Sequence, residues 1–328
     1  MQEEFMHELR GEIGEKKIVI WGIGKNVCDA EAFLQELGIY EFSYADKDLE
    51  KQDKGFHDRP VLSPEAVFNN YYLLMTMPRT REITEKLKEE GLEELRDFFF
   101  LRKLDYYLYG SGSIKELQGG IEVFGNHGCS FGIHRDSLKN QEKIIVYSFG
   151  IGEDLSFSEQ LSDKYKQCEI HAFDPTPKAI KFVENFDKGR LGSFHFYPYG
   201  LSDRNGVKRF FMPKNPKYVS GSEICNTAVD KNNTIDVEMR TLEQIMVSLG
   251  HLYIDILKMD IEGSEFEVIP QIMERHINVR QICVEFHDRL IDNGRKKRVQ
   301  VLELLKKNYY ELVYVSDSGE ELTFIKKG

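Results

Sequence analysis

Four ionisable side chains stand at the ends of two apolar segments and could together perform acid–base chemistry. Asp260 and Glu262 directly follow the apolar run 254–259, and Glu285 and His287 close the next such run. In an open α/β sheet, ligands bind at the carboxyl ends of the strands, so we expect the two pairs to converge there. Carboxylates and a histidine can act as a general base for a substrate hydroxyl or hold a divalent metal. No ligand-spacing motif demands a metal, and we expect none.

A glycine turn joins the apolar strand 143–148 to an expected helix. The turn consists of Ser148, Phe149, Gly150, Ile151, Gly152, Glu153 and Asp154. Its glycines would let a ligand approach the backbone, and the helix start offers free N–H groups. Leu155 replaces the third glycine of the dinucleotide fingerprint, and Glu153 and Asp154 would repel a pyrophosphate. The turn therefore favours a cationic or hydroxyl-bearing ligand, with a purely structural turn as the alternative.

Asp174 follows the next apolar strand, 22 residues after Gly152. A carboxylate at this position can accept hydrogen bonds from both ribose hydroxyls of a nucleoside, as it does in Rossmann-type folds. The alternative role is to cap the helix that follows. The order of strand, glycine turn, helix, strand and aspartate favours the nucleoside.

The elements that must position these residues form two series of alternating strands and helices, which predict parallel sheets. We expect a small α/β domain at residues 1–102 and a larger one at 141–328. The intervening segment, 103–140, is glycine-rich and aromatic and is interpreted as a linker and a loop-rich lead-in to the ligand site. The polar stretch 202–236 is expected to form loops and short strands. A terminal hairpin at 311–326 should add an antiparallel strand.

Composition narrows the class of partner. The net charge is −11, which disfavours nucleic acid or an anionic membrane as the main partner. The charged start of the chain does not resemble a signal peptide, and no segment approaches the roughly 20 apolar residues that span a bilayer. The five cysteines are scattered without a CxxC pair, which is typical of free thiols in a reducing cytoplasm. We therefore expect a cytoplasmic protein with a small-molecule substrate.

The segment around the first acidic pair resembles a known family. Residues 258–265, KMDIEGSE, are similar to the K-x-D-x-E-G-x-E signature of FkbM-type S-adenosylmethionine-dependent methyltransferases. Further segments resemble other motifs of the family in consistent order, namely 147–154, 172–177, 200–203, 241–243 (with Glu243 in place of Asp) and 284–287. The resemblance covers about residues 120–328. It implies a Rossmann-like class I methyltransferase sheet, parallel with an antiparallel C-terminal hairpin strand, preceded by a smaller α/β Rossmann-like domain.

The resemblance also implies a cofactor and roles. S-adenosylmethionine would contact Ser148, Gly150, Gly152, Glu153, Asp154, Asp174, Ser202 and Asp260. Acidic side chains near the turn suit its sulfonium or ammonium charge. The acceptor would be a hydroxyl of a carbohydrate or another small metabolite, such as a sugar or nucleotide-sugar. Glu262 or His287 is the candidate base and Asp260 or Glu285 its orienter, with burial raising the pKa of the working group. Glu265 and Glu267 are expected only to start a solvated helix.

Two other functions fit parts of the sequence. A two-domain NAD-dependent oxidoreductase is disfavoured because Val27 and Leu155 break the fingerprint in the two glycine turns. A non-catalytic nucleotide- or nucleotide-sugar-binding protein is the second alternative. The amino-terminal Gly22–Gly24 turn with Asp46 suits a nucleotide or nucleotide-sugar, and this domain resembles small Rossmann-like domains attached to bacterial saccharide-modifying enzymes. A structural role in docking or in a homodimer is the alternative for that domain.

Overall fold

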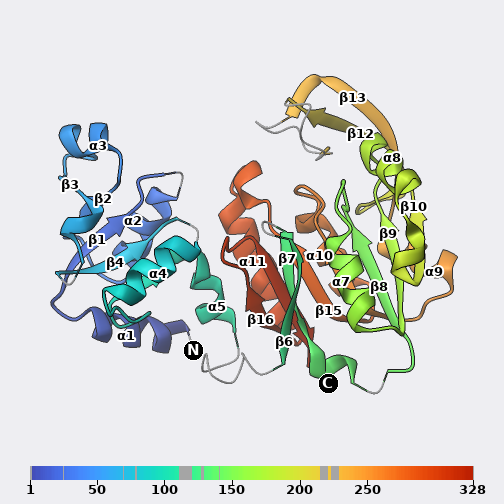
Figure 1. The fold of residues 1–328 in the computed structure, drawn as a ribbon, viewed down its shortest axis with the longest axis horizontal. Coiled ribbons are helices and arrows are strands. Elements are labelled where there is room, and N and C mark those ends of the chain that lie inside the picture. Colours follow the sequence, from blue (N-terminus) through green and yellow to red (C-terminus); the bar gives the residue numbers. More distant parts are fainter. Residues whose placement is uncertain are drawn as a thin grey trace. The chain divides into compact units, whose positions relative to one another are not determined.

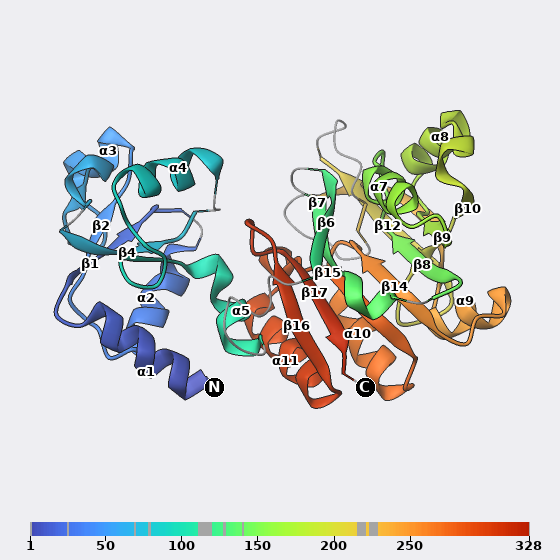
Figure 2. The same cartoon turned by 60° about the horizontal axis from the view of Figure 1, so that its bottom comes forward.

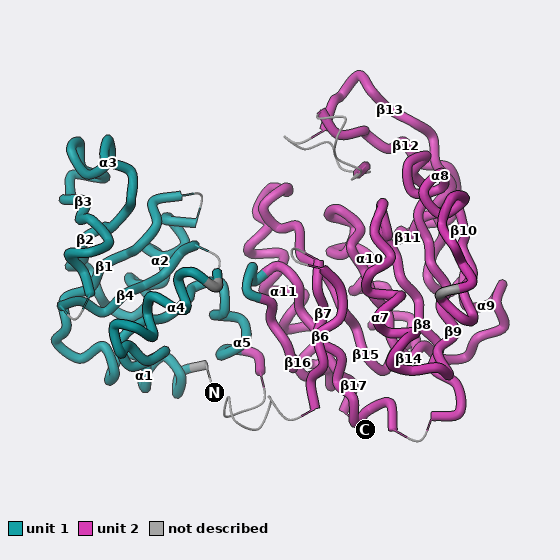
Figure 3. The backbone as a smooth tube through the Cα atoms, viewed as in Figure 1, with its two compact units in different colours: residues 1–108, 317–319 teal, residues 109–316, 320–328 magenta. Residues whose placement is uncertain are grey.

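The computed structural model describes residues 2–24, 26–68, 70–77, 80–110, 120–126, 129–139, 141–214, 221–222 and 229–327. The chain divides into two compact units: unit 1 comprises residues 1–108 and 317–319, and unit 2 comprises residues 109–316 and 320–328 (Figure 3). The glycine-rich stretch 111–119 of the expected lead-in and the fifth cysteine, Cys225, lie outside the described residues.

Unit 1 is a parallel five-stranded sheet in the order β3-β2-β1-β4-β5. The strands are β1 (Lys17–Trp21), β2 (Ser43–Ala45), β3 (Val61–Leu62), β4 (Tyr71–Met75) and β5 (Phe98–Phe100). The helices are α1 (Gln2–Ile13), α2 (Val27–Glu36), α3 (Leu49–Lys54), α4 (Arg81–Glu89) and α5 (Leu104–Tyr109). Because successive strand residues face opposite sides, Ile18 and Ile20 pack with α1 and α2, whereas Val19 and Trp21 pack on the side of α4.

Unit 2 is a seven-stranded sheet in the order β10-β9-β8-β14-β15-β17-β16 (Figures 1 and 2). Its strands are β8 (Ile144–Phe149), β9 (Cys168–Phe173), β10 (Ser193–Tyr197), β14 (Ile254–Met259), β15 (Val279–Glu285), β16 (Tyr310–Val315) and β17 (Glu321–Lys326). Its helices are α7 (Ser156–Lys164), α8 (Pro177–Asn185), α9 (Leu242–Leu249), α10 (Glu265–Glu274) and α11 (Gly294–Lys307). Among these described strands, only β17 runs opposite to the others, and it pairs antiparallel with both β15 and β16.

The central strands are apolar because both of their faces are covered. Every residue of β8 and of β14 is buried, which explains why the two strands are mostly apolar, with Asp255 and Lys258 of β14 as buried charged residues. Phe157 and Leu161 of α7 pack with Ile144 and Val146 on one face of β8. This core fixes the carboxyl ends of β8, β9 and β14, where the glycine turn and the acidic residues lie.

Two expectations about irregular structure are wrong. The expected loop-rich lead-in contains an antiparallel hairpin, β6 (Ile121–Asn126) and β7 (Cys129–His134). Its glycines lie inside strands because the space is restricted: a Cβ on Gly132 would approach the ring of Tyr314 to 2.5 Å.

The second error concerns the polar stretch 202–236. It contains the eight-residue strand β12 (Gly206–Pro213) and the start of the twelve-residue strand β13 (Val229–Arg240), which pair antiparallel. These strands rise above the rest of unit 2 in Figure 1. Their small apolar cluster, built on Phe210, Val237 and Met239, leaves most of their side chains at least partly exposed, so apolar alternation is weak. The two-residue strand β11 (Gly200–Leu201) completes this smaller sheet.

Candidate active site

A cavity of about 210 Å³ opens at the carboxyl ends of β8, β9 and β14. Its lining includes Cys129, Ser148, Gly150, Gly152, Glu153, Asp154, Asp174, Thr176, Lys258, Asp260 and Glu262. The strand order reverses direction between β8 and β14, and ligands of open α/β sheets bind at such a switch point. The cavity is therefore the natural ligand site of unit 2.

The glycine turn brings the backbone against the next strand. Gly150 has a φ of +71°, and a Cβ built there would lie 1.7 Å from the carbonyl oxygen of Asp260. Its N–H donates to the carbonyl of Phe173 at 3.0 Å. Only glycine meets both demands, because other residues rarely adopt positive φ and all of them carry a Cβ. Gly152, at φ +53°, continues the left-handed turn at the cavity wall.

Asp174 lies at the end of β9 and is 4% exposed. Its Oδ2 accepts a hydrogen bond from the N–H of Gly152 at 2.9 Å. Its Oδ1 accepts from the backbone N–H and the hydroxyl of Thr176, at 2.8 and 2.6 Å. Burial raises the pKa of Asp174, and these hydrogen bonds oppose the rise. The carboxylate thus ties the glycine turn to the start of α8 and keeps acceptor capacity toward the cavity.

The remaining residues predicted to bind the cofactor separate into two groups. Ser148 and the exposed Glu153 line the cavity. Asp154 also lines it, but its carboxylate accepts from the N–H of Ser156 at 2.7 Å, which stabilises the start of α7. Ser202 is fully buried outside the described lining, and its hydroxyl donates to Asp203 at 3.1 Å. Among the described residues, Gly200 and Leu201 are the part of that segment that reaches the cavity.

A buried lysine holds the floor of the site. Lys258, on β14, is 3% exposed, and its Nζ donates to the carbonyl of Gly150 at 2.7 Å and to that of Phe149 at 3.3 Å. Its Nζ also lies 3.5 Å from Asp260 Oδ2. Burial alone would lower the pKa of Lys258, but its neighbours, Cys129 and Asp260 among them, raise it above its ordinary value. Lys258 is therefore a charged clamp that fixes both the glycine turn and Asp260.

His287 gathers the four carboxylates of the site. Its Nε2 lies 3.6 Å from Asp260 Oδ1, 3.7 Å from Glu262 Oε2 and 3.4 Å from Glu285 Oε1. Its Nδ1 lies 3.4 Å from Glu265 Oε1. The ring is 1% exposed, so these charges are little screened by solvent. The donor atoms of Asp260, Glu262 and His287 fall within 4.8 Å of one another and could hold a metal ion.

Burial shifts the pKa values of Glu285 and His287 in opposite directions, whereas the neighbouring carboxylates raise both. Burial, followed by repulsion from Asp260, raises the pKa of Glu285 to about 7. Burial alone would lower the pKa of His287, but the carboxylates, Glu265 first, raise it well above 6.5. The surrounding carboxylates therefore favour the imidazolium form of His287, whereas the pKa of Glu285 lies near neutrality.

The expectation that Glu265 only starts a solvated helix is wrong. Glu265 is fully buried, and its carboxylate accepts from the N–H of His287 at 2.7 Å and from that of Gly263 at 2.9 Å. It faces inward because the turn before α10 is left-handed: Glu262 has a φ of +52° and Gly263 one of +108°. Glu267 is exposed, as expected.

Sequence reasoning missed several residues of the site. Lys258 lies inside the quoted signature and is missing from the predicted site, although a lysine in a mostly apolar strand is a usable signal. Cys129 is predicted only to be one of several scattered free thiols, but it lines the cavity and its Sγ lies 3.7 Å from Asp260 Oδ2. Phe210 and Gly221, which also line the cavity, belong to a stretch without a distinctive motif.

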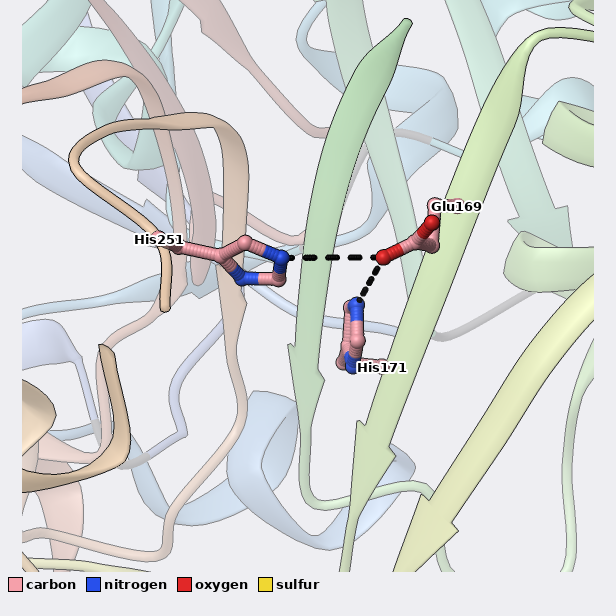
Figure 4. Close-up of side chains that lie close together, drawn as sticks. All are labelled: Glu169, His171 and His251. Atoms are coloured by element: carbon pink, nitrogen blue, oxygen red, sulfur yellow. Dashed lines mark hydrogen bonds and ion pairs between the residues drawn. The ribbon is translucent and has the colours of Figure 1, made fainter. Parts of the chain in front are cut away.

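A second group of metal-capable side chains lies toward the amino ends of the strands, away from the cavity. It consists of Glu169 and His171 on β9 and of His251, which precedes β14 (Figure 4). Nε2 of His171 is 3.0 Å from Glu169 Oε1, and Nε2 of His251 is 3.6 Å from the same oxygen. The Nδ1 atoms contact the hydroxyls of Tyr197 and Tyr147 at 3.2 and 2.8 Å. Each ring nitrogen therefore has a protein partner, which fits a structural network.

The strand order of unit 2, the glycine turn after its first strand and the acid after its second define a class: an S-adenosylmethionine-dependent methyltransferase. A family model described as the methyltransferase FkbM domain matches residues 134–312, which is more than half of the chain. The chain therefore belongs to the FkbM methyltransferase family, and S-adenosylmethionine is its methyl donor. None of the described helices is long and apolar enough to cross a membrane.

Two curated relatives share this part of the chain. The 2-O-methyltransferase NoeI of Sinorhizobium fredii is 25% identical over 206 residues, which cover 58% of this chain and 83% of NoeI. The human protein named probable methyltransferase-like protein 24 is 26% identical over 144 residues, 43% of this chain but only 32% of the human protein. Among solved structures, M. jannaschii TYW2 in complex with AdoMet aligns over 63% of this chain and 87% of its own, with 11% identity and a TM-score of 0.28.

Proposed function

We propose that this protein methylates a hydroxyl group of a carbohydrate or a related small metabolite. The observation that carries this proposal is the cluster of four carboxylates around His287, two of which, Asp260 and Glu262, line the cofactor cavity. A hydroxyl acceptor must lose a proton as it attacks, and a carboxylate beside the cofactor can take it. The printed name of NoeI, a 2-O-methyltransferase, agrees with an oxygen acceptor.

In the proposed reaction, S-adenosylmethionine would supply the methyl group to the acceptor oxygen and would itself become S-adenosylhomocysteine. Glu262 would take up the proton that the acceptor hydroxyl loses. Gly150, Gly152 and Asp174 would seat the cofactor, so that much of the catalysis is positioning. Asp260, held by Lys258, would face the positive charge of the cofactor.

We assign the base to Glu262 because the four carboxylates around His287 raise its pKa and favour its protonated form, which cannot accept a further proton. His287 would act as a positioning residue, since its imidazolium lies within 4 Å of both Asp260 and Glu262. Glu285 would compete for the imidazolium and leave Glu262 free to accept a proton.

The proposed methyltransferase domain is residues 141–328, led by segment 103–140, with residues 1–102 as a separate domain.

The test is methyl transfer from labelled S-adenosylmethionine to a panel of monosaccharides, oligosaccharides and nucleotide-sugars. With an accepted substrate, Glu262→Gln should lower kcat by roughly 10²–10⁴-fold, the usual contribution of a general base. It should leave the affinity for S-adenosylhomocysteine within about twofold, because proton transfer contributes nothing to cofactor binding. Glu267→Gln is the matched control, since Glu267 is exposed on the first turn of α10.

Two results would contradict the proposal. Full turnover in both Glu262→Gln and His287→Gln would show that this cluster does not provide the general base. Transfer to amines or thiols, with none to any hydroxyl compound, would refute the oxygen acceptor while leaving the methyltransferase class intact.

A further inference from the structure

Unit 1 contains a cavity of its own at the equivalent place in its sheet. The cavity has a volume of about 700 Å³ and lies at the carboxyl ends of β1, β2 and β4. Among the described residues, its lining includes Trp21, Gly22, Gly24, Asp46, Thr76 and Arg102. The strand order reverses between β1 and β4, so this cavity occupies the switch point of unit 1.

The glycine turn of unit 1 is held as the turn of the methyltransferase unit is held. Gly22, at φ +105°, donates its N–H to the carbonyl of Ala45 at 2.8 Å, as Gly150 does to Phe173. In both units, a side chain at the neighbouring strand across the switch point donates hydrogen bonds to the carbonyl groups of the turn. Here Thr76 donates from Oγ1 to the carbonyls of Trp21 and Gly22, at 3.2 and 2.5 Å. Lys258 makes the corresponding contacts in unit 2.

The acid after the second strand is also matched. Asp46 follows Gly24 by 22 residues, the interval that separates Asp174 from Gly152. Asp46 Oδ2 accepts from the N–H of Ile23 at 2.8 Å, and its Oδ1 accepts from the N–H two residues on at 3.0 Å. Burial would raise the pKa of Asp46, but these N–H groups and Lys51 lower it, so the carboxylate is an ionised acceptor. Unit 1 thus reproduces the arrangement proposed to hold a ribose in unit 2.

The charge around the two cavities differs in sign. Among the described residues lining the cavity of unit 2, five are acidic and only Lys258 is basic. Among those lining the cavity of unit 1, three are acidic and four are basic, namely Lys47, Lys51, Lys86 and Arg102. A balance of −4 suits the cationic methyl donor, whereas a balance of +1 suits an anionic ligand. The glycine turn and acid of unit 1 are therefore surrounded by charges that suit a phosphate.

We propose that unit 1 carries a second nucleoside site, which binds a ribonucleoside phosphate through its ribose at Asp46 and its phosphate at the basic rim. The side chain of Asn26 does not cap α2, so the N-terminus of this helix adds a favourable dipole for the phosphate. A dinucleotide is disfavoured because Val27 stands where the fingerprint requires a third glycine.

The single tryptophan of the chain makes the test specific, because Trp21 lines this cavity. The full-length protein is titrated with ADP, GDP, CDP and UDP and with the corresponding nucleosides, while tryptophan fluorescence and heat are recorded. At least one nucleotide should change the fluorescence of Trp21 saturably and bind at least tenfold more tightly than its nucleoside. S-adenosylhomocysteine should bind without this fluorescence change.

Gly24→Val is the informative variant. Gly24 is exposed without a positive φ, and a Cβ there meets nothing within 4 Å, so the substitution leaves the fold intact but fills the space of the ligand. It should weaken nucleotide binding at least tenfold at an unchanged melting temperature. Gly11→Val, on α1, is the control, because it also adds a side chain in open space but away from the cavity. Absence of binding by every nucleotide, equal binding of nucleoside and nucleotide, or undiminished binding in Gly24→Val would each overturn the proposal.

Discussion

Gly150 and Asp260 meet so closely that the position of a Cβ on Gly150 lies 1.7 Å from the carbonyl oxygen of Asp260. Gly150→Ala must therefore push β8 and β14 apart beside the cavity that we propose for the cofactor. We expect the affinity for S-adenosylhomocysteine to fall by at least 100-fold, measured by calorimetry. We also expect a melting temperature several degrees lower.

Gly250 is the control position that shows the cost of a positive φ without a steric collision. It ends α9 at φ +73°, and a Cβ there meets nothing within 4 Å. Gly250→Ala should cost about 1 kcal/mol of folding free energy and leave cofactor affinity unchanged. Equal loss of affinity in both variants would show that the contact with Asp260 is not the cause.

Asp174→Asn tests the carboxylate that we propose holds the ribose of the cofactor. The amide keeps the size of the side chain but weakens the charge-assisted hydrogen bonds. The affinity for the cofactor should therefore fall at least tenfold, a loss of about 1.4 kcal/mol in binding free energy. Asp46→Asn is the paired control in unit 1 and should leave this affinity unchanged. Calorimetry with S-adenosylhomocysteine decides the question, and undiminished affinity in Asp174→Asn would exclude the ribose role.

The pH dependence of methyl transfer should report Glu285. Its pKa is raised to about 7, so its ionised fraction grows as the pH rises through neutrality. Ionised Glu285 attracts the proton of His287 away from Glu262, so kcat/KM should rise with pH and reach half of its plateau near pH 7.

Glu285→Gln removes the titrating group and should hold kcat/KM near its low-pH value throughout. Glu267→Gln should keep the wild-type profile, because its side chain is exposed on α10. A rise near pH 7 that persists in Glu285→Gln would assign the titration to another residue.

His171 should make the protein less stable in acid. Burial lowers its pKa from 6.5 to about 4, so the unfolded chain binds more protons than the folded chain between these values. The free energy of unfolding therefore rises with pH across this window and is lost on acidification, by up to about 3 kcal/mol. Urea unfolding at several pH values measures the slope.

His171→Gln should flatten that slope, whereas His276→Asn should not, since His276 is exposed. His276 also has a positive φ that asparagine tolerates. An unchanged slope in His171→Gln would mean that another buried group controls stability in acid.

The parts of the fold that could be predicted from the sequence are those with a strong apolar pattern. The buried runs of β8 and β14 and the glycine turn between Ser148 and Asp154 indicate the sheet edge at which the cavity of unit 2 lies. The strands β12 and β13 escaped prediction because one face of each is solvated and the other packs on only a few apolar side chains. Their pairing depends on contacts with distant parts of the chain, which no local pattern reveals.

Burial of charged groups was the harder problem. Glu265 and Glu267 are two residues apart at the start of α10, yet one is fully buried and the other exposed. Helical spacing alone could not say which of them would face His287, because the left-handed turn at Glu262 and Gly263 sets the rotation of the helix. Lys258 was overlooked for a related reason: its role depends on carbonyl groups from a turn more than a hundred residues away.

The half-buried thiol of Cys129 has a consequence for redox chemistry. Burial, more than any neighbouring charge, raises its pKa to about 12, so almost no thiolate is present at physiological pH. Oxidants and alkylating reagents act on the thiolate, and of the four described cysteines only Cys28 is exposed. Oxidation of Cys129 should therefore be slow, and among the described cysteines labels should attach first to Cys28.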